Sequence, residues 1–304
     1  TQLYDPRAGG WSQDLLRVFG LPDILSEIIP AGSVFGNLRP ELIAETGLAG
    51  AKLVAVGTHD TASAVAAVPA FGAGWAYVSS GTWSLVGLET PEPVITPEAL
   101  SADLTNERGV FGTNRLLKNV MGLWLLQQCQ SAWRLPDTAA LLDAAARSPA
   151  FASLIAPDDP RFLAPGRDMP GRVQDFCRET GQPAPENPAA TTRCILESLA
   201  LRYAEVLDTL EAVTNAPITT VHVVGGGAQN RLLAQFTADA SERQVVAGPV
   251  EATLMGNLLV QAVALGRLEP KRLRQVVAAS CALERFEPRA DWSAARARFA
   301  DLKG

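Results

Sequence analysis

The chain has few of the residues that build metal and disulfide sites. Its 304 residues include two histidines and four cysteines. The cysteines are Cys129, Cys177, Cys194 and Cys281, which lie far apart and form no C-x-x-C pair. This spacing excludes the usual zinc-site patterns and a disulfide scaffold. We therefore expect reduced thiols and a cytoplasmic protein.

Basic runs and membrane-spanning segments are also missing. The net charge is −6, which argues against nucleic acid or an anionic membrane as the main partner. No residue from Thr61 to Leu88 is charged, but Pro69, Gly72 and Gly81 interrupt this stretch. A buried helix followed by buried strands fits it better than a membrane span. Apolar residues make up 47% of the chain, which is enough for a globular core.

Hydrophobic periodicity predicts a mixed α/β protein. Residues 75–80 and 83–89 read as two strands that are joined at Gly81-Thr82, a hairpin signal. Asn187 followed by Pro188 marks the start of a long helix. We further expect strands over 53–56, 220–224 and 244–247, and helices over 11–19, 62–68, 119–133, 136–147, 229–240 and 251–265. This order predicts a mixed sheet flanked by helices.

Asp60 is the first candidate for chemistry. It lies between an apolar strand and an Ala-rich helix, where a carboxylate would act as a general base toward a substrate hydroxyl. The alternative is that Asp60 is a helix N-cap. His59 would either contact a sugar hydroxyl or be a partly buried structural histidine. There is no G-x-S-x-G motif for a serine hydrolase.

Two turns of small residues are candidate phosphate-binding sites. The backbone N–H groups of Ser79–Thr82 would cradle a phosphate, unless this is an ordinary hairpin turn. Gly225–Gly227 follows a buried strand and opens a helix, which favours an anionic or flat ligand. Asn230 stands where a dinucleotide-binding fingerprint needs glycine, which weakens a dehydrogenase hypothesis. No Walker sequence is present.

Other polar positions stand in apolar surroundings. Thr105–Glu107 and Lys118–Asn119 would either border a ligand or bond to the backbone. We interpret 248–257 as structural, with Gly256 allowing close packing of its helix.

Five segments in this order carry a resemblance that covers nearly the whole chain. They are residues 57–65, 79–85, 118–127, 223–230 and 247–252. Together they resemble the FGGY carbohydrate kinases. The resemblance implies an actin-like (ribonuclease H-like) ATPase fold and the transfer of the ATP γ-phosphate to the 1-hydroxyl of L-rhamnulose, a step in L-rhamnose degradation. ATP and Mg²⁺ are the implied cofactors.

The resemblance also implies roles for individual residues. Asp60 would be the catalytic base, and His59 and Thr61, with Asp60, would bind the sugar. The ATP-binding residues would be Ser80, Gly81, Thr82, Asn119, Gln127, Gly225, Gly226, Gly227 and Asn230. No metal-ligating residue is expected within this chain.

The family's N-terminal lobe is the main departure. Residues 1–60 resemble only its tail, and residues 61–304 the C-terminal ATPase lobe. The chain begins at Thr1 without Met, so we expect a truncated chain or a missing N-terminal lobe as partner. The tail should then expose apolar surface. The alternatives are an inactive nucleotide-binding fragment and a kinase for another ketose or polyol.

Overall fold

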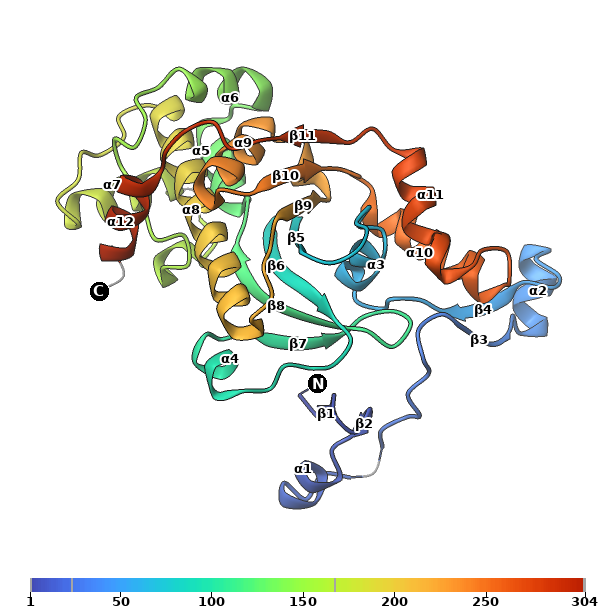
Figure 1. Ribbon diagram of the computed structural model, residues 1–304. Coiled ribbons are helices and arrows are strands. Elements are labelled where there is room, and N and C mark those ends of the chain that lie inside the picture. Colours follow the sequence, from blue (N-terminus) through green and yellow to red (C-terminus); the bar gives the residue numbers. More distant parts are fainter. Residues whose placement is uncertain (1, 23, 167, 303–304) are drawn as a thin grey trace. The chain divides into compact units, whose positions relative to one another are not determined.

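The computed structural model describes residues 2–22, 24–166 and 168–302, which form two compact units (Figure 1). Unit 1 contains Thr1–Phe71, Leu88–Leu117 and Glu251–Ser280. Unit 2 contains Gly72–Gly87, Lys118–Val250 and Cys281–Gly304. Each unit is assembled from segments far apart in the sequence. The expected domain boundary at residue 60 concerns the lobes of a kinase and stays a prediction.

Unit 1 is built from short strands and helices. Its strands are β1 (Tyr4–Asp5), β2 (Gly10–Trp11), β3 (Ser33–Asn37), β4 (Lys52–Ala55) and β7 (Thr105–Arg108). Its helices are α1 (Gln13–Val18), α2 (Pro40–Thr46), α3 (Asp60–Ala66), α4 (Pro97–Ser101), α10 (Ala252–Ala264), the 3₁₀ turn η3 (Pro270–Arg272) and α11 (Leu273–Ser280). The pairs β1–β2 and β3–β4 are antiparallel, and α2 lies between β3 and β4 in the sequence.

The early part of unit 1 exposes apolar side chains, as the sequence predicts. Val18, Phe19 and Ile24 are 76%, 67% and 79% exposed. Helix α1 has no buried residue at all. The hydrophobic core of unit 1 is instead concentrated around α3, where every residue from Thr61 to Ala66 is buried.

Unit 2 contains most of the sheet and the longest helix. Its strands are β5 (Trp75–Ser80), β9 (Thr220–Val224), β10 (Gln244–Ala247) and β11 (Glu284–Phe286), while β6 (Trp83–Thr90) and β8 (Asn114–Met121) contribute residues to both units. Its helices are α5 (Trp124–Trp133), α6 (Thr138–Ala146), η1 (Pro160–Phe162), α7 (Met169–Glu179), α8 (Pro188–Thr214), η2 (Gly226–Gln229), α9 (Arg231–Ser241) and α12 (Ser293–Asp301).

The central sheet has seven strands in the order β11-β10-β9-β5-β6-β8-β7 (Figure 1). β9 runs parallel to β5 and to β10, whereas β5–β6 and β10–β11 are antiparallel. The mixed sheet that the sequence predicts is therefore confirmed. Because β5 and β9 are parallel neighbours, the turns that follow them emerge at the same edge.

The long helix α8 begins as its sequence predicts. The Oδ1 atom of Asn187 accepts a hydrogen bond from the N–H of Ala190 at 3.0 Å, and Pro188 is the first helical residue. Fifteen of its residues, from Thr191 to Leu210, are buried. α8 packs against α9 and α6.

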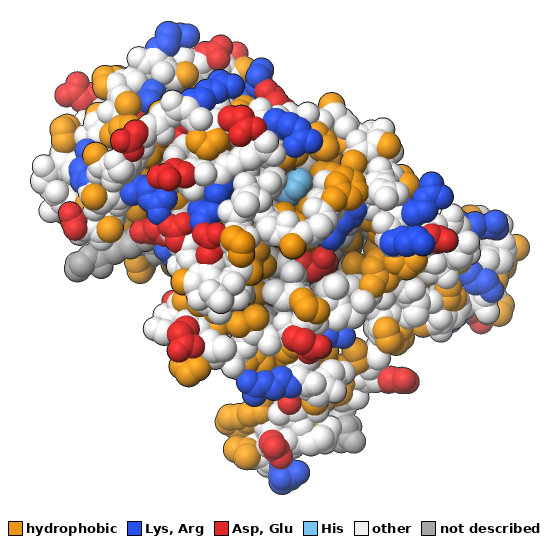
Figure 2. Space-filling model, in the orientation of Figure 1, with side chains coloured by type: hydrophobic (Ala, Val, Ile, Leu, Met, Phe, Trp, Pro, Cys, Tyr) orange, Lys and Arg blue, Asp and Glu red, His pale blue; other side chains and the backbone are white. Residues whose placement is uncertain are grey.

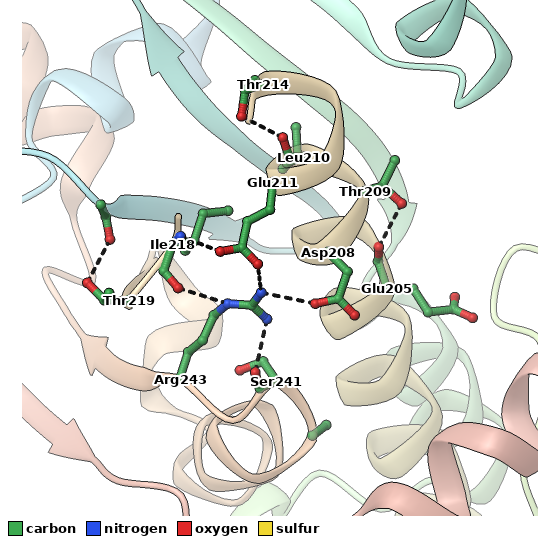
Figure 3. Close-up of polar contacts among 12 residues, drawn as sticks. Glu205, Asp208, Thr209, Leu210, Glu211, Thr214, Ile218, Thr219, Ser241 and Arg243 are labelled. Carbon is green, nitrogen blue, oxygen red and sulfur yellow. Dashed lines mark hydrogen bonds and ion pairs between the residues drawn. The ribbon is translucent and has the colours of Figure 1, made fainter. Parts of the chain in front are cut away.

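An ion-pair cluster ties the end of α8 to the start of β10 (Figure 3). Arg243 binds Asp208 at 3.0 Å and also pairs with Glu211, which accepts the N–H of Ile218 at 2.5 Å. The Arg243 side chain is 10% exposed and donates to the carbonyls of Ile218 and Ser241. This network is structural, because each member bonds to a neighbouring element.

One expected helix is wrong at its start. Residues 119–121 belong to strand β8, and the helix begins only at Trp124. Gly122 separates the two elements and packs so tightly that a Cβ there would lie 2.6 Å from the backbone of Trp83. The apolar residues on both sides of Gly122 happen to have helical spacing. Their periodicity therefore predicts one continuous helix where the structure has the end of a strand followed by a helix.

Two further observations concern the membrane and the surface charge. None of the helices among the described residues is long and apolar enough to cross a membrane. Figure 2 shows acidic and basic side chains interspersed over the visible face.

Candidate active site

The two small-residue turns are in direct contact within unit 2. Ser79 of β5 lies opposite Val224 of β9, so Ser80 meets the glycines that follow β9. A Cβ on Gly227 would lie 2.0 Å from the Ser80 Oγ atom, and a Cβ on Gly225 would lie 2.9 Å from the Ser80 carbonyl oxygen. No real Cβ approaches so closely, so this contact requires glycine at both positions.

The middle glycine faces open space. Gly225 has a φ of +86°, which favours glycine, and its N–H donates to the Pro249 carbonyl at 3.1 Å. A Cβ on Gly226, by contrast, would have no atom within 4 Å. Gly226 therefore has open space beside it, whereas Gly225 and Gly227 are tightly packed against Ser80.

The start of α5 is fixed to the turn between β5 and β6. The N–H groups of Leu123 and Trp124 donate to the carbonyls of Gly81 and Thr82 at 3.0 and 3.1 Å. The Thr82 hydroxyl donates to the Gln127 Oε1 atom at 3.3 Å. Residues of three distant segments thus meet around these turns.

A pocket of about 350 Å³ opens beside Gly226. Its lining consists of Leu123, Leu126, Gln127, Gln130, Thr138, Leu142, Gly226, Gln229 and Asn230. Apolar walls with a few amides and a hydroxyl suit a flat heteroaromatic ligand with polar edges, such as a nucleobase. The pocket lies at the start of η2 and α9, where N–H groups favour anionic or polar ligand groups.

Three of the expected ATP-binding residues line this pocket: Gln127, Gly226 and Asn230. Asn230 is also structural, because its Oδ1 atom accepts the N–H of Leu233 at 3.0 Å at the start of α9. Gly225, Gly227, Ser80, Gly81 and Thr82 form the adjoining turns without lining the pocket. Asn119 lies on β8, is exposed and does not line it either.

Sequence reasoning missed most of the pocket wall. Leu123, Leu126, Gln130, Thr138, Leu142 and Gln229 were not expected there. Gln130 donates to the Thr138 hydroxyl at 2.9 Å, which links α5 to α6. The signal that was available is the spacing of residues 123, 126, 127 and 130, which places them on one face of α5.

A buried tyrosine contacts the strand that follows the Ser79–Thr82 turn. The hydroxyl groups of Tyr203 and Ser84 are 2.6 Å apart. Burial raises the pKa of Tyr203 to about 12, so the phenol stays protonated at neutral pH. This contact links α8 to the first residues of β6.

Asp60 belongs to unit 1 and is the first residue of α3. The N-cap is His59, so the alternative of Asp60 as N-cap is wrong. The Asp60 side chain is 76% exposed, and its Oδ1 atom accepts the N–H of Thr61 at 2.7 Å. An exposed carboxylate at this position can accept a hydrogen bond from a ligand.

The two other expected sugar contacts differ in access. Thr61 is 4% exposed, and its hydroxyl lies 3.4 Å from the Asp60 Oδ1 atom. His59 has a side chain that is 56% exposed, with one ring nitrogen 3.7 Å from Asp60 and the other 3.5 Å from Glu107. His59 is therefore accessible to a ligand, whereas Thr61 is buried.

Helix α3 is held in place by glycine contacts. The Ser63 hydroxyl donates to the Gly57 carbonyl at 2.9 Å. A Cβ on Gly256 of α10 would lie 1.8 Å from the Ser63 carbonyl oxygen. The interpretation of Gly256 as a packing residue is confirmed, and the close approach of α10 fixes the helix that begins with Asp60.

Comparison with known proteins places the chain in a family. Residues 76–265 match the C-terminal domain of the FGGY family of carbohydrate kinases. The chain is 45% identical over 303 residues to a rhamnulokinase of Bacteroides thetaiotaomicron, covering 98% of this chain and 62% of that protein. It is 44% identical over 293 residues to a rhamnulokinase of Pectobacterium carotovorum, covering 96% and 58%. The chain thus spans about three fifths of the length of these relatives.

Solved structures agree with this result at the level of the fold. A Plasmodium falciparum glycerol kinase with ADP has a TM-score of 0.73 at 17% identity, with 100% of this chain and 60% of that chain covered. A ligand-bound xylulose kinase of Lactobacillus acidophilus has a TM-score of 0.73 at 16% identity, with 99% and 60% covered. These neighbours confirm the expected actin-like ATPase fold. The chain belongs to the FGGY family of carbohydrate kinases.

Proposed function

We propose that this chain is the ATP-binding part of a kinase that transfers the γ-phosphate of ATP to the 1-hydroxyl of L-rhamnulose, giving L-rhamnulose 1-phosphate. The observation that carries the proposal is the pocket beside Gly226, next to the contact between Ser80 and Gly227. The sugar follows from relatives named rhamnulokinase at 40–45% identity. We expect the activity in the cytoplasm, which fits reduced thiols.

The pocket would hold the adenosine. Its volume of about 350 Å³ lies at the lower end of ligand pockets, and its apolar residues would contact the faces of the base. The phosphates would then follow the backbone N–H groups at Gly226 and at the Ser80–Thr82 turn. Thr82 and Gln127, joined by their hydrogen bond, would fix the far side of this turn.

Asp60 would orient the attacking hydroxyl of the sugar and accept its proton as the phosphoryl group arrives. In phosphoryl transfer the protein contributes mainly by positioning and by electrostatic stabilisation. An exposed carboxylate next to an exposed histidine suits the recognition of adjacent hydroxyl groups on a sugar.

Mg²⁺ would neutralise the developing charge on the phosphates. Among residues 2–22, 24–166 and 168–302, no group of three His, Cys, Asp or Glu is arranged to hold a metal ion. Mg²⁺ commonly keeps several waters and binds substrate phosphates through one or two carboxylates, so it needs no cage made by this chain alone.

Two assays test the proposal. Calorimetric titration with ATP should show binding by the chain, and titration with NADH should show none. A coupled assay with ATP and L-rhamnulose then measures turnover, with other ketoses and polyols in parallel. Absence of ATP binding would contradict the nucleotide site, and a faster reaction with another sugar would reassign the substrate.

The second candidate is a nucleotide-binding fragment without turnover. It is favoured by the coverage of the relatives, since the chain spans only 62% and 58% of the first two. The N-terminal lobe of such a kinase would then be the missing partner. ATP binding without turnover, followed by turnover when that lobe is added, supports this candidate. Turnover by the chain alone excludes it.

A further inference from the structure

His59 lies between two carboxylates, those of Asp60 and Glu107. One ring nitrogen, Nε2, is 3.7 Å from Asp60 Oδ1, and the other, Nδ1, is 3.5 Å from Glu107 Oε2. His59 makes no capping bond to α3, although it is the N-cap residue. Its two ring nitrogens therefore each lie near a carboxylate, and neither bonds to the helix backbone as a cap.

Glu107 is bound to a buried arginine, whereas Asp60 is more exposed and is bound to its neighbour Thr61. Glu107 and Arg115 are paired across β7 and β8, and the Arg115 NH2 atom lies 2.7 Å from Glu107 Oε2. Arg115 is 1% exposed, so this charge is anchored inside unit 1. The Glu107 side chain is 30% exposed, compared with 76% for Asp60.

The buried side chain of Arg115 restrains the position of the Glu107 carboxylate. Arg115 also lies within hydrogen-bond reach of the Arg108 carbonyl, at 3.4 Å from both Nε and NH2. Removing the carboxylate from a buried guanidinium is costly, so the pair persists in the folded state. The Glu107 oxygen that binds Arg115, Oε2, is also the one that lies near His59 Nδ1.

We infer that Glu107 is a positioning residue for His59, accepting the Nδ1–H and leaving Nε2 as a hydrogen-bond acceptor on the side of Asp60. In histidine, the bond that one nitrogen makes decides which nitrogen carries the proton. This inference rests on the proposed sugar site at Asp60. Two acceptors, Asp60 and His59 Nε2, then face the ligand, so the site selects a polyol that presents two hydroxyl donors.

The tautomer of His59 can be measured on the chain itself. The sequence contains two histidines, His59 and His222. Long-range ¹H–¹⁵N spectra of the histidine-labelled chain at about pH 9, where free histidine is neutral, distinguish the protonated nitrogen from the bare one. His222 is 6% exposed, belongs to unit 2 and serves as the internal reference. His59→Asn assigns the signals.

Three variants make the measurement specific. Glu107→Met removes the acceptor and should return His59 to the Nε2–H form that free imidazole prefers. Glu107→Gln keeps an acceptor oxygen and should retain the Nδ1–H form. Glu92→Gln removes an exposed carboxylate elsewhere in unit 1 with the same change of charge, and should leave His59 unchanged. The signals of His222 should stay the same in all three.

The outcomes separate cleanly. An Nδ1–H form in the wild type that is lost in Glu107→Met and kept in Glu107→Gln supports the inference. A wild-type His59 in the Nε2–H form overturns it, even if Glu107→Met fails to fold, and so does an unchanged tautomer in a folded Glu107→Met. The measurement needs neither ATP nor sugar, so a missing kinase activity would contradict the proposed function and leave this result standing.

Discussion

Gly227 and Ser80 are in contact so close that a Cβ on residue 227 would lie 2.0 Å from the Ser80 Oγ atom. Gly226, one residue earlier, has nothing within 4 Å of the same position. The two glycines therefore have different functions. Gly227 allows two turns to pack together, whereas Gly226 leaves the adjacent pocket open.

Gly226→Leu should block nucleotide binding without unfolding the protein. Its φ is not in the left-handed region, so a side chain is tolerated by the backbone and would occupy the pocket. We expect the affinity for ATP to fall at least about tenfold, which corresponds to about 1.4 kcal/mol. Calorimetry with ATP measures the affinity, and urea denaturation should show a change in unfolding free energy of no more than about 0.5 kcal/mol.

Gly227→Ala is the matched variant with the opposite expectation. The added methyl group must displace Ser80, and overpacking of this kind costs about 1–3 kcal/mol of stability. If Gly226→Leu destabilises the protein more than Gly227→Ala does, the assignment of the two glycines is wrong.

Thr82→Val should weaken ATP binding modestly. It removes the hydroxyl that donates to Gln127 while keeping the shape of the side chain. A lost hydrogen bond of this kind is worth about 1 kcal/mol, so the dissociation constant should rise about fivefold. Thr90→Val, on the later part of β6, is the control. An ATP affinity equal to that of the wild type would show that the Thr82–Gln127 contact is only structural.

Asp60→Asn should separate binding from chemistry. Asp60 does not line the nucleotide pocket, so the ATP affinity measured by calorimetry should stay within about twofold of the wild type. In a kinase that contains this chain, turnover should fall by about 10²–10⁴-fold, the usual effect of losing a general base. A mutant within about tenfold of the wild type would show that Asp60 is not the base.

The sheet could be predicted from the sequence because its strands carry strong local signals. The β5–Gly81-Thr82–β6 hairpin, β9 and the helix after Pro188 follow from period-two alternation, turn residues and a capping asparagine. β7 was missed because its sequence, Thr-Asn-Glu-Arg, contains no apolar residue, and β11 was missed because it has only three residues. The end of β8, residues 119–121, was taken as helix because the apolar residues from Val120 to Trp133 have helical spacing across Gly122.

The site could be predicted only where its chemistry is local. Asp60 and the two turns stand out because a lone carboxylate and clustered glycines are unusual next to buried strands. Gln130, Thr138 and Leu142 could not be found, because they enter the pocket only when α5 and α6 pack together. The Glu107–Arg115 pair depends likewise on the register of β7 against β8.

Glu197 should make stability fall as the pH rises. Burial raises the pKa of Glu197, although Arg193 and the Phe151 N–H oppose this effect. The folded state then holds the proton more tightly than the unfolded state, so the contribution of Glu197 is greatest below pH 4.5 and is lost as the pH rises through the folded pKa. Urea denaturation of wild type and Glu197→Gln between about pH 4.5 and 7 should show the wild type losing stability relative to the variant. The opposite trend would mean that the ion pair with Arg193 dominates.

Gly256→Ala should destabilise unit 1, although alanine is normally the better helix former. In an exposed helix this change would stabilise by about 1 kcal/mol. Here the new methyl group would lie 1.8 Å from the Ser63 carbonyl oxygen, so α10 must move away from α3 at a cost of about 2–3 kcal/mol.

Leu258→Ala, at a position of α10 that is 65% exposed, is the control and should change the unfolding free energy by less than about 0.5 kcal/mol. Because α3 begins with Asp60, hydrogen exchange at residues 62–66 should accelerate in Gly256→Ala and not in Leu258→Ala. Equal exchange in the two variants would show that α10 does not fix the helix that carries Asp60.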